Sequence, residues 1–390
     1  MKPVDPDILI FEPRIVGHRL TWLRYITEDF LDSGYTIVWA VDLRSRARDI
    51  IEEQLVPLFP KVSLVSVFNE NGGWRGGSKI TSLDECRKIS QAKHVFLNEL
   101  DEIASNLLRR AALGIYPPSS LKGRLSGVYF RPRFLTAPVW PPGNIIKAAG
   151  FRRLCTQDWF RYIYLMDEYL ISSLKDNNKG LFHFLPDPWS GDFSCPSEDA
   201  RMALDIPVNK IVFLFYGIGD RRKGLHLIVD AMEKLVSDPR IFLLCAGTMN
   251  HDRTLLKRID ILEKRGSAKM INRYISEEEE RFSFCSADVV LLPYIHHYGS
   301  SGVLSRAAAA GKMVIASDEG LLAKRIREHH LGFLFQTENI HELQQRMNEA
   351  VLLNNEGRNN FRTTSLHYAT SCSREAFRNA LLSPWHSTIQ

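Results

Sequence analysis

Short apolar runs of strand length alternate with helix-like patterns along most of this 390-residue chain. Strands separated by helices are typical of α/β proteins, in which parallel strands form a sheet and the helices cover its faces. In the first half, the runs predicted to be strands are residues 8–12, 36–42, 62–68, 94–100, 126–130 and 162–166. The sequence therefore predicts a doubly wound α/β domain at the start of the chain.

A second alternation begins at Ile211, after a segment rich in Pro, Gly and Ser that runs from Leu185 to Asp192. That composition is typical of a linker. The predicted strands of the second half are residues 211–216, 241–246, 270–275, 289–293, 313–317 and 331–335. We therefore expect two doubly wound domains, residues 1–190 and 191–370, and a terminal helix in 371–390 that returns to the first domain. Tandem domains of this kind bind ligands in the cleft between them.

Composition narrows the range of partners. The net charge of +5 and the isoelectric point of about 8.8 favour anionic ligands or an acidic membrane surface. No RNA-binding or helix-turn-helix motif accompanies the basic residues, so no nucleic-acid partner is expected. The six cysteines form no C-x-x-C pair, which fits a reducing cytosol.

No apolar run reaches the roughly 18 residues that a membrane span needs, so we expect a cytoplasmic protein. Residues 145–154 mix apolar and basic side chains. Such a segment suits peripheral contact with a membrane surface, and the alternative is a core-facing helix with a basic rim. The sequence leaves both interpretations open.

The stretch FLFYGIGDRRKG, residues 213–224, places three positive charges in a turn between a buried strand and a helix. Arg221, Arg222 and Lys223 follow Gly217 and precede a helical pattern. An α/β sheet presents its ligand at such a turn, and the positive end of the helix dipole points to the same place. The turn suits a diphosphate, and the alternative is a solvated charge run on the surface.

A second phosphate-binding element is predicted at Ser300, Ser301, Gly302 and Val303, just before a helix of small residues. Serine hydroxyls and the amides at a helix N-terminus bind anions, and glycine allows a close backbone approach. Together with the basic turn, this element indicates one anionic ligand held from two sides.

The order of G…RKG, ADVVLLPY and SGVL…AAAAGK resembles the nucleotide-sugar-binding domain of the retaining family-4 glycosyltransferases with the GT-B fold, over about residues 211–332. The LPDPW stretch, residues 185–189, resembles the hinge of a subgroup of these enzymes. The resemblance implies two Rossmann-like domains facing each other across a cleft. The C-terminal domain would bind the nucleotide diphosphate sugar, and the N-terminal domain would bind a sugar, lipid-linked or small-molecule acceptor.

Carried over position by position, the resemblance assigns Lys223, with Arg221 or Arg222, to the donor diphosphate. The choice between the two arginines stays open. Fixed cations stabilise the charge that develops on a departing diphosphate, so neither a metal nor a cofactor is expected. The remaining donor-binding residues are Gly217 in the basic turn, Tyr274 and Ile275, which the resemblance places at the base, and Ser300, Ser301, Gly302 and Val303 at the phosphate and sugar.

Two positions depart from the family pattern. The family commonly carries two glutamates eight residues apart around the phosphate loop, and here these positions are Tyr298 and Arg306. Neither accepts hydrogen bonds from sugar hydroxyls as a carboxylate does, although Arg306 could add a cation near the phosphates. A non-catalytic binding or scaffold subunit with the same fold is therefore the alternative to an active transferase.

The acceptor side offers weaker signals. Gly17, His18 and Arg19 follow the first strand and open a helix, where they could contact an acceptor hydroxyl or phosphate. Asp101 lies in an acidic cluster with Asn98, Glu99 and Glu102 at the end of the fourth strand. A carboxylate there could deprotonate an acceptor hydroxyl, and the alternative is an acid that stabilises a helix N-terminus.

Overall fold

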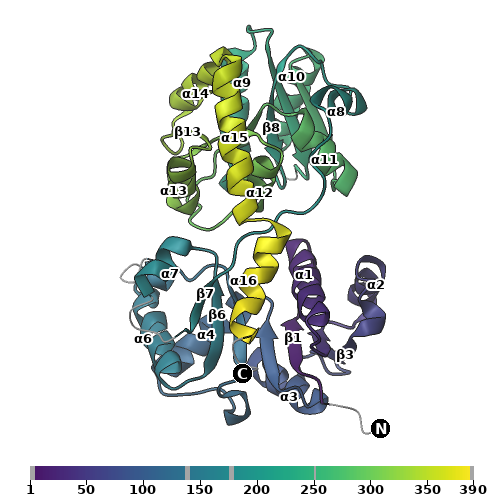
Figure 1. Ribbon diagram of the computed structural model, residues 1–390, viewed down its shortest axis with the longest axis vertical. Coiled ribbons are helices and arrows are strands. Elements are labelled where there is room, and N and C mark those ends of the chain that lie inside the picture. Colours follow the sequence, from purple (N-terminus) through teal and green to yellow (C-terminus); the bar gives the residue numbers. More distant parts are fainter. Residues whose placement is uncertain (1–4, 137–140, 175–179, 250–251, 387–390) are drawn as a thin grey trace. The chain divides into compact units, whose positions relative to one another are not determined.

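The computed structural model describes residues 5–136, 141–174, 180–249 and 252–386. The chain forms two compact units, drawn as a ribbon in Figure 1. Unit 1 comprises Met1–Leu185 and Phe377–Gln390, and unit 2 comprises Pro186–Ala376. The last described segment therefore packs in unit 1, through helix α16 (Arg374–His386).

A seven-stranded parallel sheet with strand order β3-β2-β1-β4-β5-β6-β7 forms the centre of unit 1. Its strands are β1 (Ile8–Glu12), β2 (Ile37–Val41), β3 (Ser63–Ser66), β4 (His94–Leu97), β5 (Leu125–Tyr129), β6 (Phe160–Leu165) and β7 (Phe182–Phe184). The helices that precede α16 are α1 (His18–Asp32), α2 (Ser45–Gln54), α3 (Lys79–Ser90), α4 (Asp101–Ala112), α5 (Arg133–Thr136), α6 (Gly143–Thr156) and α7 (Glu168–Leu174), with short 3₁₀-helices η1 (Phe59–Lys61), η2 (Arg75–Gly77) and η3 (Ser119–Leu121).

Both faces of the unit-1 sheet are covered, which is why its strands are continuous apolar runs. β1 and β2 are buried along their whole length. Helices α1 and α16 pack on one face, and α3, α4 and α6 pack on the other.

Unit 2 has a six-stranded parallel sheet with order β10-β9-β8-β11-β12-β13. Its strands are β8 (Ile211–Tyr216), β9 (Ile241–Gly247), β10 (Ala268–Asn272), β11 (Val289–Leu292), β12 (Met313–Ser317) and β13 (Gly332–Phe335). Its helices are α8 (Ser197–Ala203), η5 (Arg221–Lys223), α9 (Leu225–Leu235), α10 (Arg253–Lys264), α11 (Glu277–Ser286), α12 (Gly302–Ala309), α13 (Gly320–His329), α14 (Ile340–Leu352) and α15 (Asn355–Ser371). α9, α10 and α14 cover one face, and α11, α12, α13 and α15 cover the other.

The predicted α/β class, with two doubly wound sheets, is confirmed. Most predicted strands agree with the observed ones to within a few residues, and two differences matter. The strand predicted for residues 270–275 ends at Asn272, because its partner β9 ends at Gly247 and pairing stops there. β7 was not predicted, since three residues are too short a run for a periodicity to appear.

Trp385 anchors α16 to unit 1. Its side chain is 2% exposed, and its indole Nε1 donates a hydrogen bond to the Tyr164 hydroxyl at 2.9 Å. The indole packs edge-on against Phe30 of α1, with ring centroids 5.1 Å apart. Tyr164 in turn donates to the Leu381 carbonyl at 2.6 Å, so α16 and β6 hold each other through side chains.

We predict that Trp385→Ala destabilises unit 1 by about 3–5 kcal/mol, because it leaves a large cavity and removes the hydrogen bond to Tyr164. Urea unfolding followed by circular dichroism measures the change. Leu352→Ala is the control, since that side chain is 71% exposed. Equal unfolding midpoints for the two variants would show that α16 contributes little to the stability of unit 1.

Candidate functional site

The strand order of unit 2 changes direction between β8 and β11, with β9 and β10 on one side and β12 and β13 on the other. Doubly wound sheets bind ligands beside the carboxyl ends of the strands at such a switch point. The predicted basic turn follows β8, which ends at Tyr216. The predicted serine–glycine element comes after β11, which ends at Leu292. The structure therefore brings the two elements to the same switch point.

The turn after β8 is packed against the ends of both neighbouring strands. Gly247 ends β9 with φ +135°, and a Cβ there would lie 2.0 Å from the carbonyl oxygen of Gly217. Gly224 has φ +71°, and a Cβ there would lie 2.0 Å from the carbonyl oxygen of Pro293. Each of the two positions therefore requires glycine. The two contacts fix the basic turn to β9 on one side and to the end of β11 on the other.

Lys223 lies over the end of β8. The Asp220 carboxylate accepts a hydrogen bond from the Lys223 amide at 2.7 Å, which caps the short helix η5. The Lys223 Nζ lies 3.5 Å from the Tyr216 carbonyl oxygen and 5.4 Å from the centre of the Tyr294 ring. A Cβ on Gly217 would come within 2.7 Å of this Nζ. The ammonium group is thus held beside the carboxyl ends of both β8 and β11.

The structure distinguishes the two arginines of the turn. Arg222 Nη1 lies 3.2 Å from His297 Nδ1, and the Arg222 carbonyl accepts from the Ile295 amide at 2.8 Å. Arg222 therefore contacts the loop that follows β11. Arg221 lies near His226 of α9, where burial and this positive charge lower the pKa of the imidazole. The geometry favours Arg222, beside Lys223, as the second cation of the site.

A buried arginine that the sequence did not single out contacts the loop of residues 295–301. Arg325 of α13 is 3% exposed, and its Nη1 donates to the Ser300 hydroxyl at 2.8 Å. His297 Nε2 lies 3.0 Å from the Ser300 carbonyl oxygen, and the Tyr294 and Ser301 hydroxyls are 3.3 Å apart. These contacts position the loop just before α12. The amides of Gly302 and Val303 open that helix, where helix geometry provides no intrahelical acceptor for them.

Arg306, which the sequence allowed as an additional phosphate cation, is paired with a carboxylate in the structure. Its Nε donates to Glu280 Oε1 of α11 at 2.8 Å, and its Nη1 donates to the Gly302 carbonyl at 3.0 Å. The other Glu280 oxygen accepts from the Tyr216 hydroxyl at 2.5 Å. Burial and the Glu280 charge raise the pKa of the Tyr216 phenol, so the hydroxyl stays protonated and donates its hydrogen bond to Glu280. The Arg306 charge is therefore compensated inside unit 2.

This arrangement supplies a carboxylate beside the switch point although Tyr298 and Arg306 carry none. Glu280 comes from a different helix, and sequence reasoning missed it as a site residue. The only signal was the run of four glutamates, Glu277 to Glu280, which reads as a helix N-terminus. Glu280 is distinguished from Glu277, Glu278 and Glu279 by its tertiary contact with Arg306.

Tyr274 and Ile275 do not close a strand, as the sequence predicted, because β10 ends at Asn272. They lie in the short connection before α11, whose N-cap is Ser276. Tyr274 is 83% exposed, whereas Ile275 is buried. Of these two residues, therefore, Tyr274 presents its side chain to solvent and Ile275 does not.

In unit 1 the sheet order reverses between β1 and β4, and Gly17, His18 and Arg19 follow β1. Gly17 is exposed with φ +53°, and the His18 ring is edge-on to Phe130 at 6.1 Å. Arg19 is not available as a free cation for an acceptor. Its guanidinium forms ion pairs with three carboxylates at this switch point, Glu12, Glu99 and Glu102.

Asp101 has a structural role in the described fold. Its two carboxylate oxygens accept hydrogen bonds from the backbone amides of Phe130 at 2.8 Å and Arg131 at 3.1 Å. Burial raises the pKa of this carboxyl to about 6. Asp101 thereby ties the start of α4 to the loop after β5, and these contacts give no support to its predicted catalytic role.

Across residues 5–136, 141–174, 180–249 and 252–386, no group of three or more His, Cys, Asp or Glu side chains has an arrangement that could hold a metal ion. Within the same ranges, no helix combines the length and the apolar character needed to cross a bilayer.

Comparison with known proteins gives the class of this chain. Residues 196–366 match the family model described as Glycosyl transferases group 1. That segment contains β8, η5 and α12, and thus both halves of the switch-point site. No curated protein sequence matches the chain. The chain is a glycosyltransferase, and unit 2 carries its group 1 domain.

Solved structures support the same fold over nearly the whole length. Sucrose-phosphate synthase from Thermosynechococcus elongatus has a TM-score of 0.69 at 14% identity, covering 98% of this chain and 99% of that one. HepE from Anabaena in complex with UDP has a TM-score of 0.70 at 12% identity, covering 98% and 100%. A glycosyltransferase from Rickettsia africae has a TM-score of 0.70 at 13% identity, covering 99% of each chain. The architecture is that of GT-B glycosyltransferases.

We predict that Glu280→Ala destabilises unit 2 by about 1–3 kcal/mol, because it leaves the Arg306 guanidinium without its carboxylate partner. Glu277→Ala on the exposed start of the same helix is the matched control. Thermal or urea unfolding compares the two variants. A Glu280→Ala protein as stable as the Glu277→Ala protein would contradict the pairing.

Proposed function

We propose that this glycosyltransferase moves a sugar from a nucleotide diphosphate sugar to an acceptor hydroxyl, with retention of configuration, as a retaining family-4-like enzyme. The observation that carries the proposal is the position of Lys223 and Arg222 beside the ends of β8 and β11. Two cations at a doubly wound switch point suit a diphosphate. The Anabaena HepE structures with UDP and with UDP-glucose support a donor of this class.

The proposed chemistry depends on charge that develops during the reaction. As the bond between sugar and diphosphate breaks, the leaving diphosphate gains negative charge. The Lys223 ammonium and the Arg222 guanidinium stabilise that charge, together with the amides of Gly302 and Val303 and the hydroxyls of Ser300 and Ser301. Donors fixed before the reaction need little reorganisation, and the contacts of Arg325 and His297 with Ser300 provide that rigidity.

We propose that these cations and amides perform the electrostatic work without a bound metal or an organic cofactor. A lysine and an arginine supply charges that a divalent cation supplies in other phosphoryl-binding sites. The donor is then a substrate that the protein binds directly.

Glu280 is proposed to bind donor hydroxyls in place of the two glutamates that the sequence lacks. Each of its carboxylate oxygens already accepts one hydrogen bond, from Arg306 or Tyr216, and each retains a further lone pair. Its side chain is 20% exposed, so part of the carboxylate can be reached by a ligand. Tyr274, next to α11 and largely exposed, is proposed to contact the nucleotide base.

The acceptor is proposed to bind in unit 1, at the switch point between β1 and β4. Gly17 and His18 offer an open backbone and an exposed imidazole there. Arg19 acts as a positioning residue, because it orients Glu99 and Glu102 through ion pairs. A sugar, a lipid-linked sugar or a small hydroxylated molecule fits such a polar rim.

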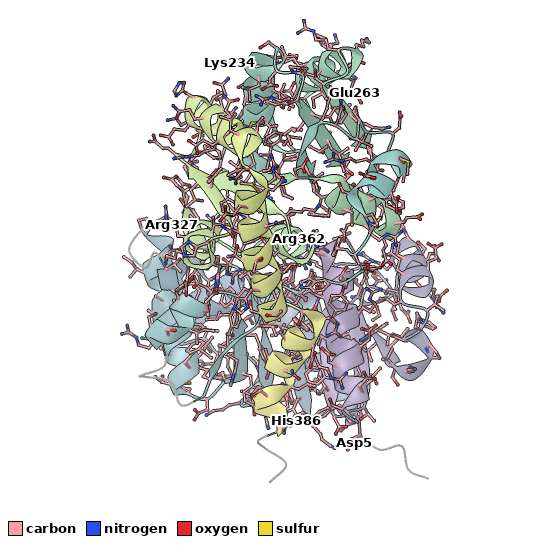
Figure 2. The ribbon with its side chains drawn as sticks, turned by 45° about the horizontal axis from the view of Figure 1, so that its top comes forward. Asp5, Lys234, Glu263, Arg327, Arg362 and His386 are labelled. Atoms are coloured by element: carbon pink, nitrogen blue, oxygen red, sulfur yellow. The ribbon has the colours of Figure 1, made fainter. Side chains whose placement is uncertain are left out.

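We predict that Lys223→Ala lowers kcat/KM by about 100- to 1,000-fold, since it removes one fixed charge from the leaving group. Lys234→Ala is the matched control, because Lys234 is an exposed lysine at the far end of α9 (Figure 2). Calorimetry with a panel of nucleoside diphosphates and a donor-hydrolysis assay measure affinity and turnover. If Lys223→Ala binds every nucleotide as the unaltered chain does, the site is wrongly placed.

The two arginines give a sharper test of the same site. Arg222→Ala is expected to weaken nucleoside diphosphate binding by about tenfold or more, and Arg221→Ala much less, because Arg222 contacts the loop after β11 whereas Arg221 lies near His226 of α9. If Arg221→Ala weakens nucleoside diphosphate binding more than Arg222→Ala does, Arg221 rather than Arg222 is the second cation of the site. Retention is tested separately, by reading the anomeric configuration of the product by NMR as soon as it forms.

A further inference from the structure

One long stretch of unit 1 contains no acidic residue. Between Glu102 and Asp158 there is neither Asp nor Glu, whereas nine Lys and Arg residues occur there. The chain as a whole is close to balanced, with 50 basic and 45 acidic residues. The stretch includes most of α4, all of β5 and α5, and all of α6. Apart from Asp101 and Glu102 in the first turn of α4, the helices and the strand of this stretch therefore carry no acids to compensate its positive charge.

Helices α4 and α6 of this stretch pack directly against each other. A Cβ on Gly150 would lie 1.8 Å from the Leu108 carbonyl oxygen, so the two backbones approach as closely as glycine permits. Arg153 Nη1 donates to the Ala112 carbonyl at 2.6 Å, at the end of α4. Leu107, Leu108, Phe151 and Leu154 point into the core. The two helices thus pack side by side, with these apolar side chains in the core and other residues of both helices exposed.

That outer surface combines cations with exposed aliphatic side chains. Ile145 and Ile146 are 55% and 49% exposed, and Leu113 and Ile115 are 77% and 46% exposed. We call the following residues the α4–α6 face: Arg109, Arg110, Leu113, Ile115, Ile145, Ile146, Arg152 and Arg153, all of them exposed. The apolar members lie at the start of α6 and just after α4, and the arginines lie along the two helices.

We propose that the α4–α6 face binds the surface of a membrane that contains anionic lipids. Arginines attract anionic headgroups, and aliphatic side chains beside them insert at the boundary between headgroups and acyl chains. Both components are needed for lasting contact, because charge alone is screened by salt and four aliphatic side chains alone bind weakly. The proposal concerns where the enzyme works, and it is independent of the donor site in unit 2.

A nucleic acid is the other large polyanion to consider. Its phosphates would use the arginines, but Ile145, Ile146, Leu113 and Ile115 would gain nothing from a polar backbone, and the face exposes no aromatic side chain for base stacking. The exposed aliphatic residues therefore favour a lipid surface, and nucleic-acid binding becomes an outcome of the test.

The test is sedimentation of the full chain with vesicles of phosphatidylcholine alone or mixed with phosphatidylglycerol. We expect binding to the anionic vesicles only, with release at high salt. Ile145→Ser with Ile146→Ser should reduce the partition coefficient by about tenfold. Arg109→Gln with Arg152→Gln should reduce it by about thirtyfold. Arg153 is left unchanged because it caps α4.

Matched controls remove the same groups elsewhere on the chain. Val56→Ser with Val208→Ser removes two aliphatic side chains that are 57% and 56% exposed. Arg46→Gln with Lys61→Gln removes two exposed charges near α2. Both controls should bind vesicles as the unaltered chain does. Equal binding to both vesicle types, equal losses in the controls, or duplex DNA binding that the isoleucine variant leaves unchanged would each overturn the proposal.

Discussion

The close approach of the basic turn to the end of β11 is the constraint on which the site depends. Gly224 leaves no room for a Cβ beside the Pro293 carbonyl, and the Arg222 carbonyl accepts from the Ile295 amide. These backbone contacts hold η5 against the loop that leads to Ser300 and α12. The proposed two-sided anion site depends on these contacts, because they keep the turn that carries Lys223 beside the loop that leads to α12.

Cations in this chain divide into those buried in structural contacts and those exposed on the basic turn. Arg325 donates a hydrogen bond to Ser300, and Arg306 donates one to Glu280. Arg19 forms ion pairs with three carboxylates in unit 1. Each is largely buried, where an unpaired charge would be costly, so each has a partner of its own. The cations of the basic turn are more exposed, and there Arg222 lies 3.6 Å from the Asp220 carboxylate with half of its side chain open to solvent. Counting basic residues along the sequence does not separate these two groups.

The fold was largely predictable because parallel strands covered on both faces must be apolar throughout. Runs such as Ile211–Tyr216 and Met313–Ser317 agree with β8 and β12 residue for residue. The prediction failed where pairing, rather than composition, sets the end of a strand. Tyr274 and Ile275 are apolar residues typical of strands, yet they follow Asn272 and Arg273, and β9 offers no partner beyond Gly247. β7, at the edge of its sheet, has only three residues in which a pattern could appear.

The sequence by itself determined the two α/β sheets and the basic turn with Lys223, because period, turn residues and charge are local properties. Only the tertiary structure favours Arg222 over Arg221 for the proposed site, since it shows that the Arg222 side chain reaches His297, 75 positions along the chain. Only the structure showed that Glu280 pairs with Arg306, and that Asp101 binds backbone amides rather than standing open. Contacts between residues far apart in sequence leave no periodic signal, which is why these assignments had to come from the fold.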